Sequence, residues 1–191
     1  MRAVIPGAIL SFMAVAATIS AMDPAAAQKQ IVHYGMSFPE RVSGFRRSES
    51  HDFEKSKPGL GYSVRYLRPG WTVDVFVYDL RRASIPDDPK SDAIRAQFEQ
   101  AQGDIFSTQK SGRYKTVSLK ELFAVANARR QERLACGAYA LTRETDHFDS
   151  YLCVGGWNNK FVKFRLTAQP RDSNMTMARQ FLEAWSRTLW P

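Results

Sequence analysis

The two cysteines are the residues whose chemistry the sequence indicates most clearly. The chain contains only Cys136 and Cys153, and both lie in segments whose composition predicts neighbouring strands of one hairpin. Pairing them directly opposite each other centres the turn on Glu144 and Thr145. This spacing is consistent with a disulfide, which for a loop of this size stabilises a protein by about 3 kcal/mol. Two buried free thiols are the alternative. A redox-catalytic pair is disfavoured, because no Cys-x-x-Cys spacing occurs.

The histidines form no metal-binding or catalytic pattern. There are three, His33, His51 and His147, and they fall in three different predicted segments. A zinc site needs ligands that converge, and neither His-x-x-x-His nor His-Glu-x-x-His is present. The sequence also lacks a Gly-x-Ser-x-Gly nucleophile turn and a phosphate-binding loop. We therefore predict no catalytic residue, no metal and no cofactor, which makes an enzyme the less favoured class of protein.

One carboxylate lies where it needs a partner. Asp74 stands between two valines in a predicted strand, and an ionised side chain in that position must be neutralised. In an antiparallel pair with the preceding strand, Arg65 lies roughly opposite. The pattern favours an ion pair on the sheet surface over a catalytic acid.

Aromatic and basic side chains are the remaining functional signal. Aromatic residues make up 12% of the chain, and large exposed apolar patches on proteins often bind partners. An uncovered patch that combines both kinds of residue would suit an envelope protein, an anionic lipid or a glycan. The predicted partner-binding surface consists of Arg65, Arg68, Trp71, Tyr78 and Lys163.

The charge balance favours anionic neighbours. The formal net charge is +8, but the basic residues are scattered along the chain. No block of them is dense enough to resemble a nucleic-acid-binding tail. A nucleic-acid partner is therefore not predicted.

The first 27 residues have the composition of a cleavable signal peptide. A basic start at Arg2 precedes an apolar run over 3–21, and small residues at 25–27 fit cleavage before Gln28. An uncleaved anchor is the alternative, because the apolar run approaches the roughly 20 residues that span a bilayer. We predict a periplasmic or secreted protein with no transmembrane span after cleavage, a flexible lead-in over 28–37 and a single domain over 38–191.

Alternating apolar residues predict strands, and two longer segments predict amphipathic helices. One helix follows Asp87, Asp88 and Pro89, which resemble a helix start, and carries an apolar stripe ending at Ile105. The other is capped by Asp172 or Ser173. Strands are predicted over 45–53, 60–67, 71–80, 113–125, 134–142, 150–157 and 160–168. Short links between strands make antiparallel neighbours, so the fold class is α+β, with a largely antiparallel sheet flanked by two helices.

This layout resembles the PsbP-like fold, which occurs in many small exported bacterial proteins. The matching segments are Phe38-Pro39, the paired strands over 59–80, the helix after Ile85-Pro86 and the strand over 160–165 before the last helix. The resemblance covers most of residues 38–190. It implies a compact module that works by binding or assembly, and it carries no catalytic residue onto this chain.

The leader, the basic chain and the absence of any catalytic pattern together predict an exported, non-enzymatic binding or assembly module at the bacterial cell envelope. Two alternatives remain. A periplasmic hydrolase-type enzyme would need ionisable side chains, distant in sequence, that converge in a deep pocket. A structural subunit of an envelope complex would present a large flat apolar patch. An open aromatic and basic surface would favour binding.

Overall fold

A computed structural model describes residues 31–191 of the chain. The predicted leader and its cleavage site lie outside the described residues. The elements in chain order are β1 (Ile31–His33), β2 (Met36–Phe38), β3 (Arg41–Val42), β4 (Phe45–Asp52), β5 (Tyr62–Arg68), β6 (Trp71–Tyr78), α1 (Asp92–Lys110), β7 (Thr116–Ala126), β8 (Glu132–Arg143), β9 (Asp146–Trp157), β10 (Lys160–Ala168) and α2 (Asn174–Leu189).

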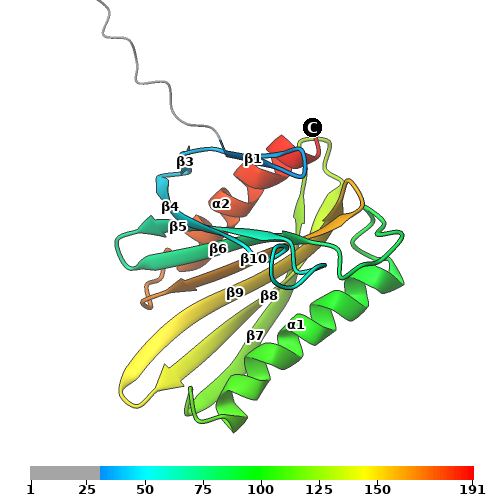
Figure 1. Ribbon diagram of the computed structural model, residues 1–191. Coiled ribbons are helices and arrows are strands. Elements are labelled where there is room, and N and C mark those ends of the chain that lie inside the picture. Colours follow the sequence, from blue (N-terminus) through cyan, green and yellow to red (C-terminus); the bar gives the residue numbers. More distant parts are fainter. Residues whose placement is uncertain (1–30) are drawn as a thin grey trace, which may run out of the picture.

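The main sheet has eight strands in the order β3-β4-β5-β6-β10-β9-β8-β7. Every neighbouring pair is antiparallel, as short connections require. At the β5–β6 turn, Gly70 has a φ of 78°, a left-handed conformation that glycine adopts without steric cost. The two helices lie against opposite faces of the sheet (Figure 1). The predicted α+β class is therefore confirmed.

The α2 face of the sheet holds the larger core. Alternation along β6 places Val73, Val75 and Val77 on this face, all fully buried. Trp185 of α2 contacts a set of aromatic rings from the sheet and the small hairpin. That set is Phe38, Tyr66 and Phe164. Aromatic side chains bury more apolar area than any others, so this cluster is a main source of stability.

The α1 face is only partly covered. Helix α1 packs on β7, β8 and β9, where Ile94 and Ile105 meet buried residues of those strands. It begins after Ser91, whose Oγ accepts a hydrogen bond from the Ile94 amide at 3.5 Å. The predicted start, with Pro89 as the first helical residue, is therefore too early. The segment before Ser91 is held instead by the turn between β9 and β10, since the Ile85 amide donates to Oδ1 of Asn159 at 2.7 Å.

Residues 31–37 do not form the expected flexible lead-in. They build a two-stranded hairpin, β1–β2, whose turn uses Tyr34 and Gly35 in left-handed conformations. The alternation of β2 turns Met36 and Phe38 into the core, where both are buried. Burial of these two side chains holds the segment against the core.

Cys136 and Cys153 form a disulfide. They are directly opposite each other in the β8–β9 register, with Cα atoms 4.1 Å apart. Both are buried on the α2 face. The predicted pairing is confirmed, and its place in the core indicates a structural bond.

Candidate functional site

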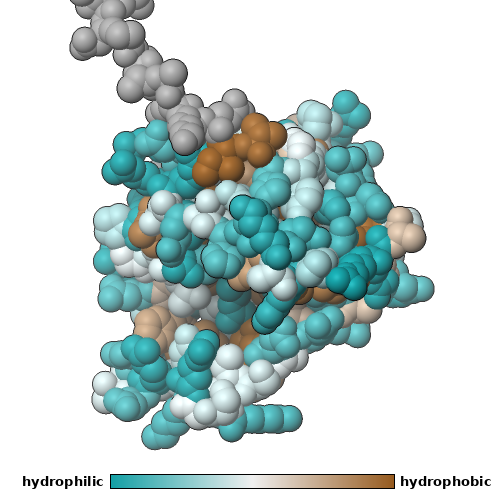
Figure 2. Space-filling view, viewed as in Figure 1, coloured by the Kyte–Doolittle hydropathy of each residue, from teal (hydrophilic) through white to brown (hydrophobic). Residues whose placement is uncertain are grey.

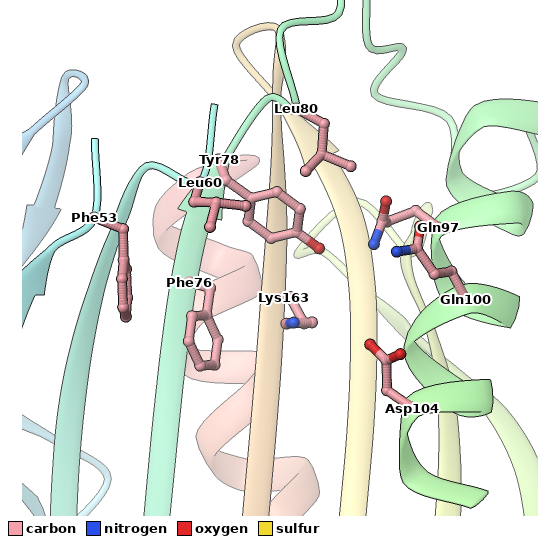
Figure 3. A pocket seen from close by; sticks show the side chains of 9 residues that line it. All are labelled: Phe53, Leu60, Phe76, Tyr78, Leu80, Gln97, Gln100, Asp104 and Lys163. Carbon is pink, nitrogen blue, oxygen red and sulfur yellow. The ribbon is translucent and has the colours of Figure 1, made fainter. Parts of the chain in front are cut away.

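A groove runs along α1 over the part of the sheet that this helix leaves uncovered. Three adjoining hollows share Phe76 of β6. One of them, with a volume of about 250 Å³, lies between β6, β10 and α1. In Figure 2 hydrophobic residues show in the recess beside α1, below a rim of hydrophilic ones. We call this hollow the groove; it is lined by Phe53, Leu60, Phe76, Tyr78, Leu80, Gln97, Gln100, Asp104 and Lys163 (Figure 3).

The floor of the groove combines a cation with two aromatic rings. Lys163 of β10 is paired in register with Phe76 of β6. Its ammonium nitrogen lies 4.6 Å from the centre of that ring and 5.4 Å from the centre of the Tyr78 ring. Burial lowers the pKa of Lys163 below its ordinary value. The rings partly replace the water that the ammonium loses.

Arg165 lies next to Lys163 on the same face of β10 and lines the adjoining hollow. Burial also lowers the pKa of Arg165, although Asp104 and Asp74 oppose the shift. Neither Lys163 nor Arg165 makes an ion pair or a side-chain hydrogen bond with another residue within 31–191. Two half-buried cations without counter-ions are costly, because each has given up hydration without a direct replacement.

The wall of the groove is polar and comes from α1. Gln97, Gln100 and Asp104 are spaced at three and four residues, so they share one side of the helix. Figure 3 shows all three side chains extending from α1 toward the floor. Asp104 favours the charged form of Lys163, but it makes no ion pair with it. The amides can donate and accept hydrogen bonds, so this wall suits a polar group of a ligand.

The hydroxyl of Tyr78 is buried and has no hydrogen-bond partner among the described residues. Burial raises the pKa of Tyr78, and the nearby Gln97 amide opposes that shift. Gln97 is thus a neighbour of the hydroxyl without reaching hydrogen-bond geometry. An unsatisfied buried hydroxyl costs about 1–3 kcal/mol, and Tyr78 lines the groove.

The apolar rim is held by a carboxylate. The Glu54 carboxylate accepts hydrogen bonds from the backbone amides of Gly59 and Gly61, at 2.9 Å each. This closes the loop between β4 and β5 and fixes Phe53 and Leu60 at the rim. The rim thereby offers an ordered apolar surface next to the cationic floor.

The sheet divides the five residues that the sequence predicted as a partner-binding surface. Tyr78 and Lys163 lie in the groove, and Arg65 lies on the same face in an adjoining hollow. Trp71 lies on the α2 face, buried in the core and stacked on Tyr151. Arg68 also lies on the α2 face, and its guanidinium carbon is 5.8 Å from the centre of the Phe45 ring. The five therefore do not form one surface.

Arg65 forms the predicted ion pair. Its Nε donates to Oδ1 of Asp74 at 2.7 Å, and its Nη1 donates to Glu49 at 2.6 Å. Arg65 and Asp74 are directly opposite each other in the β5–β6 register. Hydrogen bonding to Asp74 raises the pKa of Arg65. Because both carboxylates engage this guanidinium, Arg65 is less available to an anionic ligand than Lys163 or Arg165.

Other residues of the site were not singled out from the sequence. Lys163 and Arg165 alternate with Val162, Phe164 and Leu166, which signals that both cations share the face opposite the core. The polar residues of α1 carried a similar signal in their helical spacing. Their convergence with the cations depends on where α1 crosses the sheet. The additional residues are Phe53, Leu60, Phe76, Leu80, Gln97, Gln100, Asp104 and Arg165.

Between residues 31 and 191, no three His, Cys, Asp or Glu side chains gather in a way that could hold a metal ion. No helix in that range is both long and apolar enough to cross a membrane.

Comparison with known proteins identifies the fold. The chain is similar to the solution structure of cyanobacterial PsbP (CyanoP) from Synechocystis sp. PCC 6803, with a TM-score of 0.51 and 12% identity over 88% of this chain and 96% of that chain. It is less similar to PA94, a Pseudomonas aeruginosa protein of unknown function, with a TM-score of 0.34 and 11% identity over 75% of this chain and 82% of that chain. No family model matches the sequence, and no curated protein matches it. The fold is PsbP-like, as the sequence predicted.

Proposed function

We propose that this protein is an exported binding module and that the groove takes an amphipathic ligand with an anionic group. The observation that carries the proposal is the pair Lys163 and Arg165, two half-buried cations without counter-ions. An anionic group placed between them would supply the missing neutralisation. With Asp104 included, the three side chains carry two positive charges and one negative, so one positive charge remains for the ligand.

The apolar part of the ligand has its own surface. Phe53, Leu60 and Phe76 line the groove beside the cations, and burial of an alkyl or aromatic group against them contributes about 25 cal/mol per Å². Small-molecule sites in proteins commonly combine such an apolar lining with a few placed polar groups. An anionic lipid has both features.

Binding is favoured over the hydrolase alternative by the lining of the groove. Covalent hydrolysis needs a nucleophile beside a general base. The residues that line the groove include no serine, cysteine or histidine, although Ser50, His51 and Ser63 line an adjoining hollow. The groove is also open to solvent rather than deeply enclosed.

Export is supported by the leader-like composition of residues 1–27 and by the disulfide, a bond that persists in oxidising compartments. Cell fractionation with amino-terminal sequencing tests this part. We expect a chain that begins at Gln28 in the periplasmic or extracellular fraction. An intact amino terminus with free thiols in the cytosol would contradict it.

Calorimetric titration with two short amphiphiles tests the ligand class. Octyl phosphate carries an anionic head and octyl glucoside a neutral one, and both have the same chain. We expect octyl phosphate to bind more tightly, and Lys163→Met or Arg165→Met to weaken it by roughly tenfold or more. Lys115→Met and Arg129→Met, at exposed positions outside the groove, are the matched controls. Equal binding of the two amphiphiles, or equal losses in the controls, would overturn the proposal.

A further inference from the structure

The second candidate for an interaction surface is the outer edge of β7, on the other side of α1 from the groove's floor. Strand β7 is the last of the eight strands, and its outer edge pairs with no other strand of the described chain. Figure 1 shows it at the margin of the sheet behind α1. Its backbone groups along this edge are free to pair with another strand.

Two leucines are exposed on this strand. Leu119 is 40% exposed and Leu122 is 62% exposed. Both belong to the few large hydrophobic residues that the fold leaves in solvent. Single exposed leucines are ordinary on protein surfaces, but two on one unpaired edge strand form a potential contact.

A β-bulge sets the faces of these residues. The register with β8 shifts between Leu119 and Glu121, so that Leu119 is opposite Tyr139 and Leu122 is opposite Gly137. Since Tyr139 and Gly137 share a face of β8, Leu119 and Leu122 share a face of β7.

The same bulge groups two charged residues on the other face. Glu121 is opposite Ala138, on the α2 face, and it lines a hollow there together with Lys120. Both side chains are exposed, and neither forms an ion pair within the part of the chain that the structure describes. The bulge therefore presents an unpaired cation and an unpaired anion side by side.

We propose that β7 pairs antiparallel with β7 of a second copy of this protein, about a two-fold axis that passes through the bulge. In this register Leu119 lies opposite Leu122 of the second copy, and Lys120 lies opposite Glu121 of the second copy. Each contact occurs twice, because a two-fold interface uses the same patch on both subunits. The bulge makes the register symmetric, since Lys120 and Glu121 together occupy one position of the ladder.

Neighbouring registers lack this complementarity. A register centred on Lys120 places this lysine opposite the same lysine of the second copy. A register centred on Glu121 likewise places two glutamates opposite each other. Like charges directly opposite each other destabilise a strand pair. A lysine and a bulge also discourage unspecific pairing at an edge. The edge is thus protected against general aggregation while one self-complementary register is favoured.

Sedimentation velocity of the purified protein over a series of concentrations tests this inference. We expect a monomer–dimer equilibrium. Lys120→Glu and Glu121→Lys should each weaken dimerisation by roughly tenfold, because each turns two attractive pairs into two repulsive ones. The double variant Lys120→Glu/Glu121→Lys should restore it, because the opposite charges are paired again in reversed order.

Lys57→Glu, at an exposed position far from β7 in the sequence, is the control for the change in net charge in Lys120→Glu. Circular dichroism checks that every variant folds, and the recovery in the double variant excludes a general loss of structure. A monomer at all concentrations would overturn the inference. So would a dimer that the single charge reversals leave unchanged, since it would use another surface.

Discussion

The ammonium of Lys163 faces the ring of Phe76 across two paired strands, at 4.6 Å from the ring centre, and no carboxylate of residues 31–191 lies within 4.0 Å of it. A lysine on the uncovered face of a sheet can usually extend its side chain into water. Here the neighbouring rings and α1 restrict it, and burial lowers its pKa. The position is therefore unfavourable for the folded protein and suitable for binding an anion.

We predict that Lys163→Met stabilises the protein by about 1 kcal/mol at neutral pH, because a flexible apolar side chain replaces a poorly hydrated cation. Urea denaturation of the two proteins measures the difference. Lys115→Met, at an exposed position, should change the free energy of unfolding by less than about 0.5 kcal/mol. A less stable Lys163→Met protein would mean that the contacts with the two rings outweigh the cost of burial.

The lowered pKa of Lys163 predicts that the stability of the protein depends on pH. Its pKa is lowered from 10.5 in the folded state, so above the lowered value the unfolded chain binds more protons than the folded protein. The free energy of unfolding should then rise with pH between the lowered value and 10.5. Urea denaturation at neutral pH and at about pH 10 should show this contribution in the wild-type protein and its absence in Lys163→Met. Identical pH profiles for the two proteins would contradict it.

The disulfide gives a prediction for the α2 face. Cys136 and Cys153 are separated by 17 positions in sequence, and releasing a loop of that size costs about 3 kcal/mol in the chain-entropy model. We expect the double variant Cys136→Ala/Cys153→Ala to lose roughly this much stability in urea denaturation. Reductant should lower the stability of the wild-type protein and leave the double variant unchanged. A wild-type protein insensitive to reductant under denaturing conditions would show that the bond contributes little.

Much of the sheet could be predicted because strand pairing depends on local patterns. The hairpin turn near Glu144 followed from the position of two cysteines, and the Arg65–Asp74 pair followed from a short turn between alternating strands. The same alternation also separates Trp71 from Tyr78. They stand an odd number of residues apart in one strand, so they face opposite sides of the sheet.

The groove could not be predicted in the same way, because it depends on where α1 lies. The helix carries its own apolar stripe, but that stripe does not specify which strands it covers. Its position is set by contacts of the preceding segment with distant residues, such as the Ile85 amide with Asn159. Convergence of Gln97 and Asp104 with Lys163 is a result of this tertiary placement.

Substitutions at two glycines test how the segment before α1, which contains Pro86, is held in place. A Cβ added at Gly156 of β9 would lie 1.8 Å from the carbonyl oxygen of Pro86, whereas one added at Gly103 of α1 would meet nothing within 4 Å. We expect Gly156→Ala to destabilise the protein by about 1–3 kcal/mol, because either β9 or the segment around Pro86 must move to make room for the methyl group. Gly103→Ala should stabilise it by about 0.5–1 kcal/mol through helix propensity.

Thermal denaturation measures the stability of the two glycine variants, and calorimetric titration with octyl phosphate measures how tightly each binds this ligand. Displacement of the segment around Pro86 shifts the start of α1 and with it the wall of the groove, so Gly156→Ala should also bind more weakly. Gly103→Ala should bind normally. Normal stability and binding in Gly156→Ala would show that the segment accommodates a methyl group without moving the helix.

Two buried tyrosines provide the sharpest comparison between stability and binding. The hydroxyl of Tyr66 donates to the Pro39 carbonyl at 2.9 Å, while the hydroxyl of Tyr78 has no partner in the described chain. Tyr66→Phe should therefore cost about 1 kcal/mol, and Tyr78→Phe should be neutral or stabilising, because it removes an unsatisfied buried group. If the ligand supplies the missing partner, Tyr78→Phe should weaken octyl phosphate binding although the protein is no less stable. Urea denaturation and calorimetric titration of the two variants measure both quantities. Equal losses of stability would show that both hydroxyls are hydrogen-bonded in solution, and unchanged binding by Tyr78→Phe would exclude its hydroxyl from the site.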